Sequence, residues 1–386
     1  MAVAAAEGKK DGSESETEAA GYPFDALPQI DYRRHPAYAV DASLGKRVRA
    51  LAAFGKGLAI VLLRWLSDYE HLPKPPEGAA RLGWFVSRIP AYAWLIPRQR
   101  LRRLVARRPD CRSERGRAVL DALERDGVAI FHLTAAEQDE MRRLLAPAFD
   151  ALGTRLAAIP AAELKFDDNR LWLDSRSESG IYRWFTDMLG RAGAIEASST
   201  YLGRPVSVAH LIPQTNLPEN DFWRGRFADA GIADPASNYC HVDTAYNVTK
   251  MIIYVDEVTR ENGPFSFVAG SHRANRGFLD GLVRRANDYA GLSATAPRQR
   301  ALFASLPRFL RKKCAFGADV ADDHPHAGAI RAHERHFTSD QAHAILFDPA
   351  GIHRGGMVSQ GSRRVVTVLF SEAAQATVSR RAARPR

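Results

Sequence analysis

The chain has 386 residues, 46% of them hydrophobic, and a formal net charge of +10 at pH 7. This length and composition allow a large folded core, which excludes a fibrous protein and predicts one catalytic domain of about 250 residues with an accessory region. The three cysteines are widely spaced and provide no disulfide framework, so we expect a reducing, cytoplasmic compartment.

The first 115 residues are predicted to lie outside the catalytic domain. Residues 1–20 contain a short Ala/Val stretch followed by lysines and an acidic Ser/Glu run, which indicates a disordered leader rather than a signal peptide. Residues 21–115 are expected to form a helical accessory region. The Pro-rich stretch 72–78 predicts a stiff linker within that region.

Residues 44–66 are the most apolar stretch of the accessory region. Basic residues interrupt it, so it does not fit a bilayer-spanning helix, which needs about 20 largely uncharged apolar residues. Its apolar residues recur at helical spacing and predict an amphipathic helix. We expect this helix to dock onto the catalytic domain, and peripheral contact with an anionic membrane surface is the alternative.

Residues 116–375 are predicted to form the catalytic domain. Five short runs bounded by turn residues predict strands, at 206–212, 251–255, 265–268, 343–347 and 364–370. Residues 273–340 show little strand pattern, and we expect them to form an insert or lid that recognises substrate. Residues 376–386 are expected to form a basic tail.

The triplet His241-Val242-Asp243 is a candidate metal site. In an extended strand, side chains two positions apart share one face, so His241 and Asp243 can bind one ion together. His353 follows much later, after a strand-like run and a turn, and must be brought to the site by the fold. Two imidazoles and one carboxylate are typical of non-haem Fe(II) oxygenases, which keep further coordination positions open for a co-substrate and O2.

Four segments carry a resemblance to a known family. They are Tyr239-Cys240-His241-Val242-Asp243, the run from Glu261 to Arg273, His353-Arg354-Gly355-Gly356, and Gly361-Ser362-Arg363-Arg364-Val365-Val366-Thr367. In order and spacing they resemble the phytanoyl-CoA dioxygenase-like family of Fe(II)/2-oxoglutarate-dependent oxygenases. The likeness begins near Leu123 and extends to about Phe370.

The resemblance implies a fold that is mainly β with flanking helices, in which a double-stranded β-helix, or jelly-roll, forms the catalytic core after an N-terminal helical region. It implies Fe(II) bound by His241, Asp243 and His353, with 2-oxoglutarate and O2 as co-substrates. Arg364, eleven positions after His353, is expected to bind the far carboxylate of 2-oxoglutarate. Its neighbour Arg363 is then expected to face the other way.

Two amides are further candidates for binding 2-oxoglutarate. Gln214 and Asn216 end a predicted strand that points toward the His241-Val242-Asp243 region. In similar oxygenases, amides near this place help to hold the co-substrate. The alternative is that both are turn residues.

The function implied by the resemblance is hydroxylation, or another oxidation, of a C–H bond in a small-molecule or acyl substrate, with release of succinate and CO2. Asp243 favours hydroxylation, because related halogenases have a small residue at this place. Basic clusters at 98–117 and 308–313 are typical of solvated helix faces, although they also fit an anionic partner or substrate.

Other functions stay open at this point. A membrane-associated lipid-modifying oxygenase, a non-catalytic oxygenase-like binding protein and a cupin-like metalloenzyme independent of 2-oxoglutarate all fit part of the pattern. Nucleic acid is not a favoured partner, because nucleic-acid demethylases of the wider superfamily carry a second arginine where this chain has Phe370. The remaining short-spaced histidines are predicted to be solvated rather than zinc ligands: His324, His326, His333 and His336.

Overall fold

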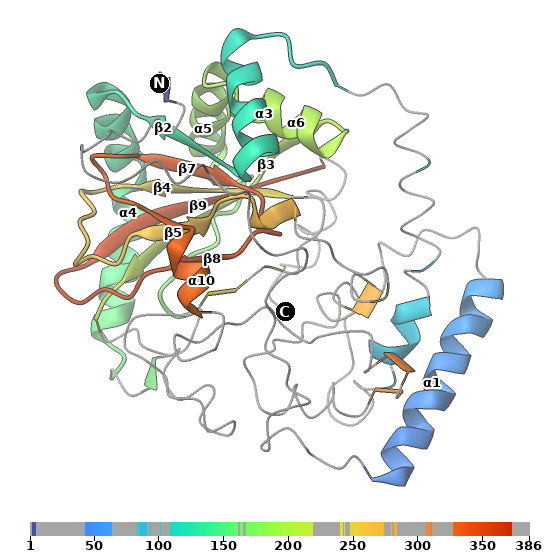
Figure 1. Ribbon diagram of the computed structural model, residues 1–386. Helices are drawn as coiled ribbons and strands as arrows, with labels where there is room; N and C mark the ends of the chain where they lie inside the picture. Colours follow the sequence, from blue (N-terminus) through green and yellow to red (C-terminus); the bar gives the residue numbers. More distant parts are fainter. Residues whose placement is uncertain are drawn as a thin grey trace.

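The computed structural model contains two antiparallel sheets (Figure 1). The structure describes residues 2–4, 43–63, 83, 85–90, 93, 101, 109–160, 163–164, 167–218, 240–241, 243, 248–273, 279, 282–283, 306–307, 309–310 and 327–372. The larger sheet has the strand order β1-β2-β7-β4-β9-β3, and the smaller has the order β6-β5-β8. The strands are β1 (Ala2–Ala4), β2 (Val128–His132), β3 (Val206–Asn216), β4 (Thr249–Tyr254), β5 (Phe265–Val268), β6 (Glu334–Phe337), β7 (Ala344–Phe347), β8 (His353–Gly355) and β9 (Arg363–Glu372).

Helices cover the outer face of the larger sheet. The helices are α1 (Leu44–Leu63), α3 (Glu114–Asp126), α4 (Ala135–Ala157), α5 (Ser179–Arg191), α6 (Ala194–Leu202) and α10 (Ala327–Ala332), with a short 3-10 turn at Ser271–Arg273. Of these, α3 to α6 pack onto the sheet and bury one continuous apolar core with it. None of the described helices has both the length and the apolar character that a membrane span requires.

A second apolar core lies between the two sheets. The inward faces of β2, β4, β7 and β9 meet β5 and β6 there, and the core includes Phe265, Phe267 and Phe347. Period-two alternation decides which side chains face it. On β4, Tyr254 belongs to this inner core, whereas Met251 and Ile253 belong to the core under the helices.

The transition from α3 into β2 begins the region that resembles the oxygenase family. Ser113 caps the first turn of α3 by accepting a hydrogen bond from the Gly116 N–H. Gly127 ends the helix with a φ of 78°, a conformation that side chains with a Cβ rarely adopt. The chain then enters β2, which pairs with β7 at the centre of the sheet.

The predicted strands are present, four of them with shifted ends, and α1 matches the predicted amphipathic helix. Two predictions need correction. The described helices hold more residues than the described strands, so the chain is a mixture of antiparallel sheets and helices rather than mainly β. Within the predicted disordered leader, residues 2–4 form β1 at the edge of the larger sheet. The linker 72–78, the tail 376–386 and most of the 273–340 insert lie outside the described residues.

Candidate metal centre and adjoining pocket

The backbone joins the two candidate histidine ligands directly. His241 and His353 form an antiparallel bridge, in which each N–H donates to the carbonyl of the other at 3.0 and 2.9 Å. The Asp243 N–H donates to the Pro349 carbonyl at 2.8 Å. The fold therefore holds the segment before β4 against the segment that enters β8, and brings residues from distant parts of the sequence to one place.

His353 presents a ring nitrogen toward Asp243. Its Nδ1 lies 2.9 Å from the Gly351 carbonyl oxygen, which can only accept a hydrogen bond, so we assign the ring proton to Nδ1. Nε2 then carries the lone pair and lies 3.4 Å from Asp243 Oδ2. A carbonyl behind a histidine ligand is a common way of fixing the tautomer that a metal requires.

Asp243 is held as a carboxylate. Burial acts to raise its pKa, but nearby groups, among which the Lys250 ammonium acts most strongly, outweigh burial and keep the pKa well below its usual range. Lys250 Nζ lies 2.5 Å from Oδ2, and His241 Nε2 lies 3.8 Å from Oδ1. The carboxylate is thus ready to bind a cation without first losing a proton.

The three side chains fit a metal ion. Ligand atoms of His241, Asp243 and His353 all lie within 4.8 Å of one another, a separation that small side-chain movements reduce to one coordination sphere. Two imidazoles and one carboxylate are the donor set of a facial triad, which suits Fe(II). The metal-ligand prediction from the sequence is supported by this arrangement.

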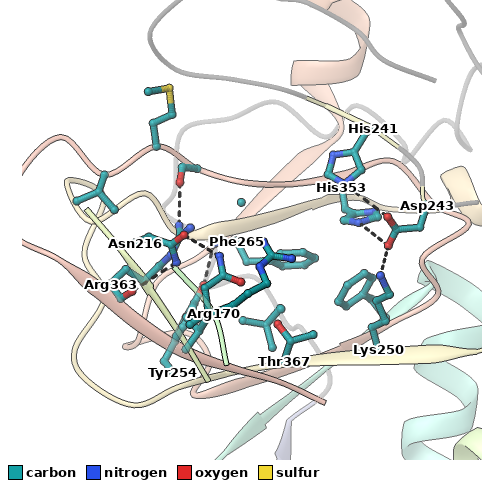
Figure 2. A pocket seen from close by; sticks show the side chains of 18 of the residues that line it. Arg170, Asn216, His241, Asp243, Lys250, Tyr254, Phe265, His353, Arg363 and Thr367 are labelled. Atoms are coloured by element: carbon teal, nitrogen blue, oxygen red, sulfur yellow. Dashed lines mark hydrogen bonds and ion pairs between the residues drawn. The ribbon is translucent and has the colours of Figure 1, made fainter. Parts of the chain in front are cut away.

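A cavity of about 220 Å³ adjoins the triad and lies between the two sheets (Figure 2). Strands of the larger sheet supply one wall, and β5 and β8 supply the other. Besides the triad, its lining includes Arg170, Gln214, Asn216, Lys250, Ile252, Tyr254, Phe265, Phe347, Met357, Arg363, Val365 and Thr367.

Arg363 lies in this cavity with its guanidinium buried. Nη1 donates to the Gly356 carbonyl at 2.9 Å and, more weakly, to the Asn262 carbonyl at 3.5 Å. Burial lowers the pKa of Arg363 to about 10, and the guanidinium stays charged at neutral pH. No carboxylate among the described residues forms an ion pair with it. A buried cation with donors left for a ligand is a suitable site for a carboxylate.

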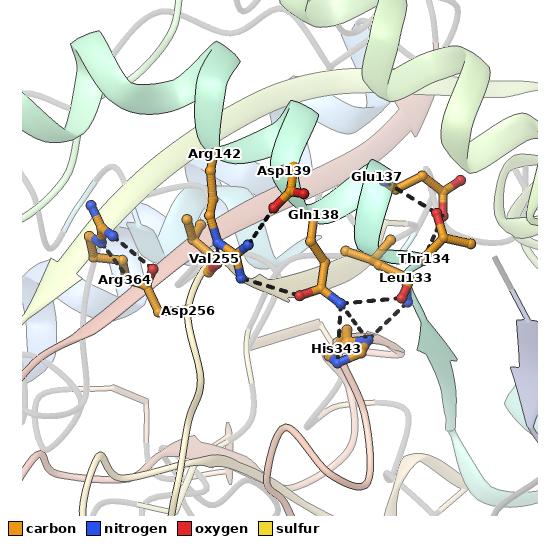
Figure 3. A network of polar contacts seen from close by, with 10 residues as sticks. All are labelled: Leu133, Thr134, Glu137, Gln138, Asp139, Arg142, Val255, Asp256, His343 and Arg364. Carbon is orange, nitrogen blue, oxygen red and sulfur yellow. Dashed lines mark hydrogen bonds and ion pairs between the residues drawn. The ribbon is translucent and has the colours of Figure 1, made fainter.

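Arg364 lies on the opposite face of β9, where it contacts Asp256 (Figure 3). Its Nε and Nη2 donate to Asp256 at 2.5 and 2.7 Å, and its guanidinium stacks 5.3 Å from the ring centroid of Phe149 on α4. From the sequence, Arg364 was predicted to face the co-substrate site and Arg363 to face away from it, and the structure shows the reverse. The physical reason is the phase of β9: Val365 shares the face of Arg363 and belongs to the core between the sheets, whereas Val366 shares the face of Arg364 and lies under the helices.

Both predicted amides line the cavity. Gln214 Nε2 donates to Asn216 Oδ1 at 2.7 Å, and Asn169 donates to the same oxygen at 3.1 Å. Asn216 Nδ2 in turn lies 3.4 Å from the Arg363 carbonyl. Both amides belong to β3, which extends to Asn216, so they are strand residues rather than turn residues.

Sequence reasoning missed two further cations of the cavity. Lys250 is the one charged residue of β4, and a lysine in such an apolar strand was a usable signal. Arg170 lies in an irregular segment, and no local pattern marks it. Of the four short-spaced histidines, His324 and His326 lie outside the described part of the chain. His336 lies 3.6 Å from Glu334 and does not line the cavity.

Solved structures give distant likenesses. EctD from S. alaskensis, solved with 2-oxoglutarate and 5-hydroxyectoine, is 16% identical, with a TM-score of 0.39 over 68% of this chain and 77% of that chain. AviO1 from Streptomyces viridochromogenes Tue57 is 17% identical, with a TM-score of 0.36 over 70% of this chain and 98% of that chain. The epimerase SnoN, solved with Fe3+, alpha ketoglutarate and nogalamycin RO, is 11% identical, with a TM-score of 0.39 over 67% of this chain and 84% of that chain.

A search of curated proteins finds no match to this chain. The family model of phytanoyl-CoA dioxygenase, in contrast, matches residues 124–365, which is more than half of the sequence. This range contains the metal triad and the Arg363 site. The chain therefore belongs to the phytanoyl-CoA dioxygenase family of iron- and 2-oxoglutarate-dependent dioxygenases.

Proposed function

We propose that this dioxygenase hydroxylates, or otherwise oxidises, a C–H bond of a small-molecule or acyl substrate and releases succinate and CO2. The observation that carries the proposal is the placement of the His241, Asp243 and His353 triad at one end of a cavity that also contains the buried Arg363 guanidinium. When bound, iron supplies the redox chemistry with 2-oxoglutarate and O2. The residues of the chain position these reactants and exclude competing reactions.

We assign the far carboxylate of 2-oxoglutarate to Arg363. The carbonyls of Gly356 and Asn262 fix one nitrogen of the guanidinium, and the planar group can still meet a carboxylate with its other donors. Asn216 supports the same strand end through the Arg363 carbonyl, and Gln214 supports Asn216. In this proposal the two amides act mainly by positioning Arg363.

The sheets are proposed to form a double-stranded β-helix around this cavity. Two facing antiparallel sheets, with the triad and Arg363 between them, support that architecture. Asp243 supplies the anionic ligand whose presence favours hydroxylation.

A cytoplasmic location is proposed from cysteine usage, because Cys111 and Cys240 are free thiols.

The test is iron binding and 2-oxoglutarate turnover in the full chain. We expect the wild type to bind one Fe(II) under anaerobic conditions and to convert 2-oxoglutarate to succinate when O2 is admitted. His353→Ala should lose both, because it removes one of the three ligands. His336→Ala is the matched control, since His336 does not line the cavity. Undiminished iron content in His353→Ala would contradict the metal site, and iron binding without succinate would favour an enzyme that does not use 2-oxoglutarate.

A second proposal concerns the surface of α1. Five apolar side chains, at spacings of three, four and seven residues, form an exposed stripe: Leu44, Val48, Leu51, Leu58 and Leu62. The opposite side of the helix packs inward, because Ala50 is buried, Gly57 lies against Ser87 and Phe54 contacts Phe309. Every charged residue of α1 is basic. An apolar stripe with only positive charges beside it fits an anionic lipid surface, so we propose peripheral membrane attachment through α1.

Vesicle co-sedimentation tests this attachment. The full chain should sediment with vesicles rich in phosphatidylglycerol and much less with phosphatidylcholine vesicles. Leu51→Ser combined with Leu58→Ser should abolish sedimentation, whereas Leu101→Ser, a change at an exposed leucine outside α1, should not. Equal binding to both vesicle types, or none, would contradict the proposal. Self-association that the α1 double variant removes would assign the stripe to a second copy of the chain instead.

A further inference from the structure

An exposed tryptophan lies at the edge of the sheet that forms one wall of the cavity. Trp172 is 57% exposed, and its ring contacts the His210 ring edge-to-face, with 5.3 Å between the centroids and 81° between the planes. We propose that this pair, the aromatic corner, binds a planar ring of the substrate. The inference rests on the proposed function and names part of the substrate class.

The segment 169–173 runs antiparallel beside β3. Arg170 bridges to Gln214, and both of these residues line the cavity. Side chains two positions apart in an extended segment share one face, so Trp172 faces the same side of the sheet as Arg170. The same antiparallel register places Trp172 opposite Ile212. Trp172 therefore belongs to the face of the sheet that forms the cavity wall.

A first row of side chains leads from the cavity to Trp172. Ile252 on β4 pairs with Thr367 on β9, and Thr367 pairs with Ile212 on β3. Ile252 and Thr367 line the cavity, and Trp172 follows Ile212 on the adjoining segment. Since neighbouring strands lie about 4.8 Å apart, the row spans roughly 14 Å from β4 to Trp172.

A second row leads from the metal triad to the same place. Lys250 on β4 contacts the metal ligand Asp243 (Figure 2). Lys250 pairs with Leu369 on β9, and Leu369 pairs with His210 on β3. The side chains of Leu369 and His210 are only half-buried, so this face keeps surface for a ligand. Both rows end at the aromatic corner.

Two aromatic rings at nearly a right angle suit a flat ligand. A planar ring can stack on one of them and present its edge to the other, and aromatic pairs prefer both arrangements. A flexible acyl chain gains from buried apolar area alone and needs no such geometry. Single exposed apolar side chains are ordinary on protein surfaces. Trp172 differs from them because it continues the lining of the cavity.

The two rows also set a distance within the substrate. The C–H bond that is oxidised lies at the metal triad, and the planar ring lies at the aromatic corner, two or three strand spacings away. The substrate class is therefore one whose planar ring is about 10–14 Å from the oxidised carbon.

Calorimetry on the full chain tests the preference for a planar ring. Three alcohols with the same number of carbon atoms serve as probes: planar 2-naphthol, saturated decahydro-2-naphthol and linear 1-decanol. We expect 2-naphthol to bind about fivefold more tightly than the other two, which corresponds to one aromatic pair. Trp172→Leu should remove this preference, and Trp172→Phe should keep part of it. Phe309→Leu is the matched control, because Phe309 is an exposed aromatic residue outside both rows, and it should keep the full preference.

Proton NMR locates the bound probe relative to the metal triad. Mn(II) is paramagnetic and broadens the proton signals of a ligand bound near it, whereas Zn(II) does not. With N-oxalylglycine filling the 2-oxoglutarate place, the 2-naphthol signals should be broader with Mn(II)-loaded protein than with Zn(II)-loaded protein. Trp172→Leu should lose most of this difference. Equal line widths in the wild type would place the probe far from the triad, for example on α1, and would overturn the proposal.

The calorimetric outcomes can also overturn it. Equal affinity for 2-naphthol and 1-decanol would exclude a planar ring, and weaker binding of both to Trp172→Leu would then assign the aromatic corner to an acyl chain. A preference that persists in Trp172→Leu, or no binding of any probe, would remove Trp172 from substrate binding. Failure to bind Mn(II) and N-oxalylglycine would overturn the proposed function, whereas the ring preference is also measured on the metal-free protein and is decided separately.

Discussion

At the scale of single residues, Arg363 and Arg364 show how environment divides two identical side chains. Arg364 has a carboxylate partner in Asp256 and an aromatic ring beside it, so its charge is already satisfied at the surface. Arg363 is held by carbonyl oxygens, which orient a guanidinium without neutralising it. A buried, oriented and charged guanidinium is therefore available for a dicarboxylate.

Replacing each arginine in turn tests this difference. Arg363→Ala should weaken 2-oxoglutarate binding by about 2–5 kcal/mol, or roughly 30-fold or more, because it leaves a buried carboxylate without its partner. Arg363→Lys should recover only part of the loss, since an ammonium lacks the planar fork. The measurement is the apparent affinity for 2-oxoglutarate with Fe(II) saturating.

Arg364→Ala is the control for this series and should leave that affinity nearly unchanged. Circular dichroism should show that each variant is folded. A large loss in Arg364→Ala beside a normal Arg363→Ala would mean that the inward face of β9 has been assigned wrongly.

The sequence identifies the metal triad but not which of Arg363 and Arg364 faces the cavity, and strand geometry explains both outcomes. His241 and Asp243 are two positions apart, so any strand puts them on one face. Arg363 and Arg364 are neighbours, so choosing between them requires the phase of β9 relative to the core. That phase comes from long-range packing, in which Val365 meets the smaller sheet and Val366 meets the helices. No local pattern contains this information.

At the scale of elements, Tyr254 connects the two sheets that enclose the cavity. Its hydroxyl accepts a hydrogen bond from the Phe265 N–H of β5 at 2.8 Å and donates to the Phe337 carbonyl of β6 at 2.7 Å. Burial raises its pKa to about 12, so it stays protonated and can donate at any ordinary pH. One side chain of β4 is thus hydrogen-bonded to β5 and β6, two of the three strands of the smaller sheet.

At the Arg363 end of the cavity, close backbone contact likewise holds two segments of the chain together. Gly263 has a φ of 66°, and a Cβ there would lie 2.3 Å from the Met357 carbonyl oxygen. This approach holds the Asn262 and Gly356 carbonyls on either side of the Arg363 nitrogen. The role of Gly263 in shaping the arginine site depends on the 355–360 loop, which is distant in the sequence.

Tyr254→Phe tests the connection between the sheets. The change removes only an oxygen and leaves a buried N–H and a buried carbonyl without partners, which should cost about 1–3 kcal/mol of unfolding free energy. Urea denaturation measures the cost. Thr154→Ala is the control, because it removes a hydroxyl on α4 that bonds within its own helix, and it should change stability by less than about 0.5 kcal/mol. A Tyr254→Phe protein as stable as the wild type would show that the sheets do not depend on this hydroxyl.

At the scale of the whole molecule, two histidines are kept neutral where elements pack together. Burial is the main cause of a lowered pKa at His272 and His343. His343 precedes β7, and its Nδ1 accepts a hydrogen bond from the Leu133 N–H after β2, a bond that needs an unprotonated nitrogen (Figure 3). The nearby His132 lowers its pKa further. Protonation at these sites therefore opposes folding.

The resulting pH dependence follows from proton linkage. A group whose pKa is lower in the folded chain contributes stability above its ordinary value, here 6.5, and this contribution is lost as the pH falls through the lowered pKa. We expect the urea concentration at the midpoint of unfolding of the wild type to be lower at pH 5.5 than at pH 7.5. His343→Asn should reduce this fall, because the amide oxygen can accept the Leu133 bond and does not titrate. Gln138→Ala serves as the control, since it removes a neighbour of His343 but leaves the titrating ring in place. If His343→Asn showed the same fall as the wild type, the acid sensitivity of the fold would have to come from other groups.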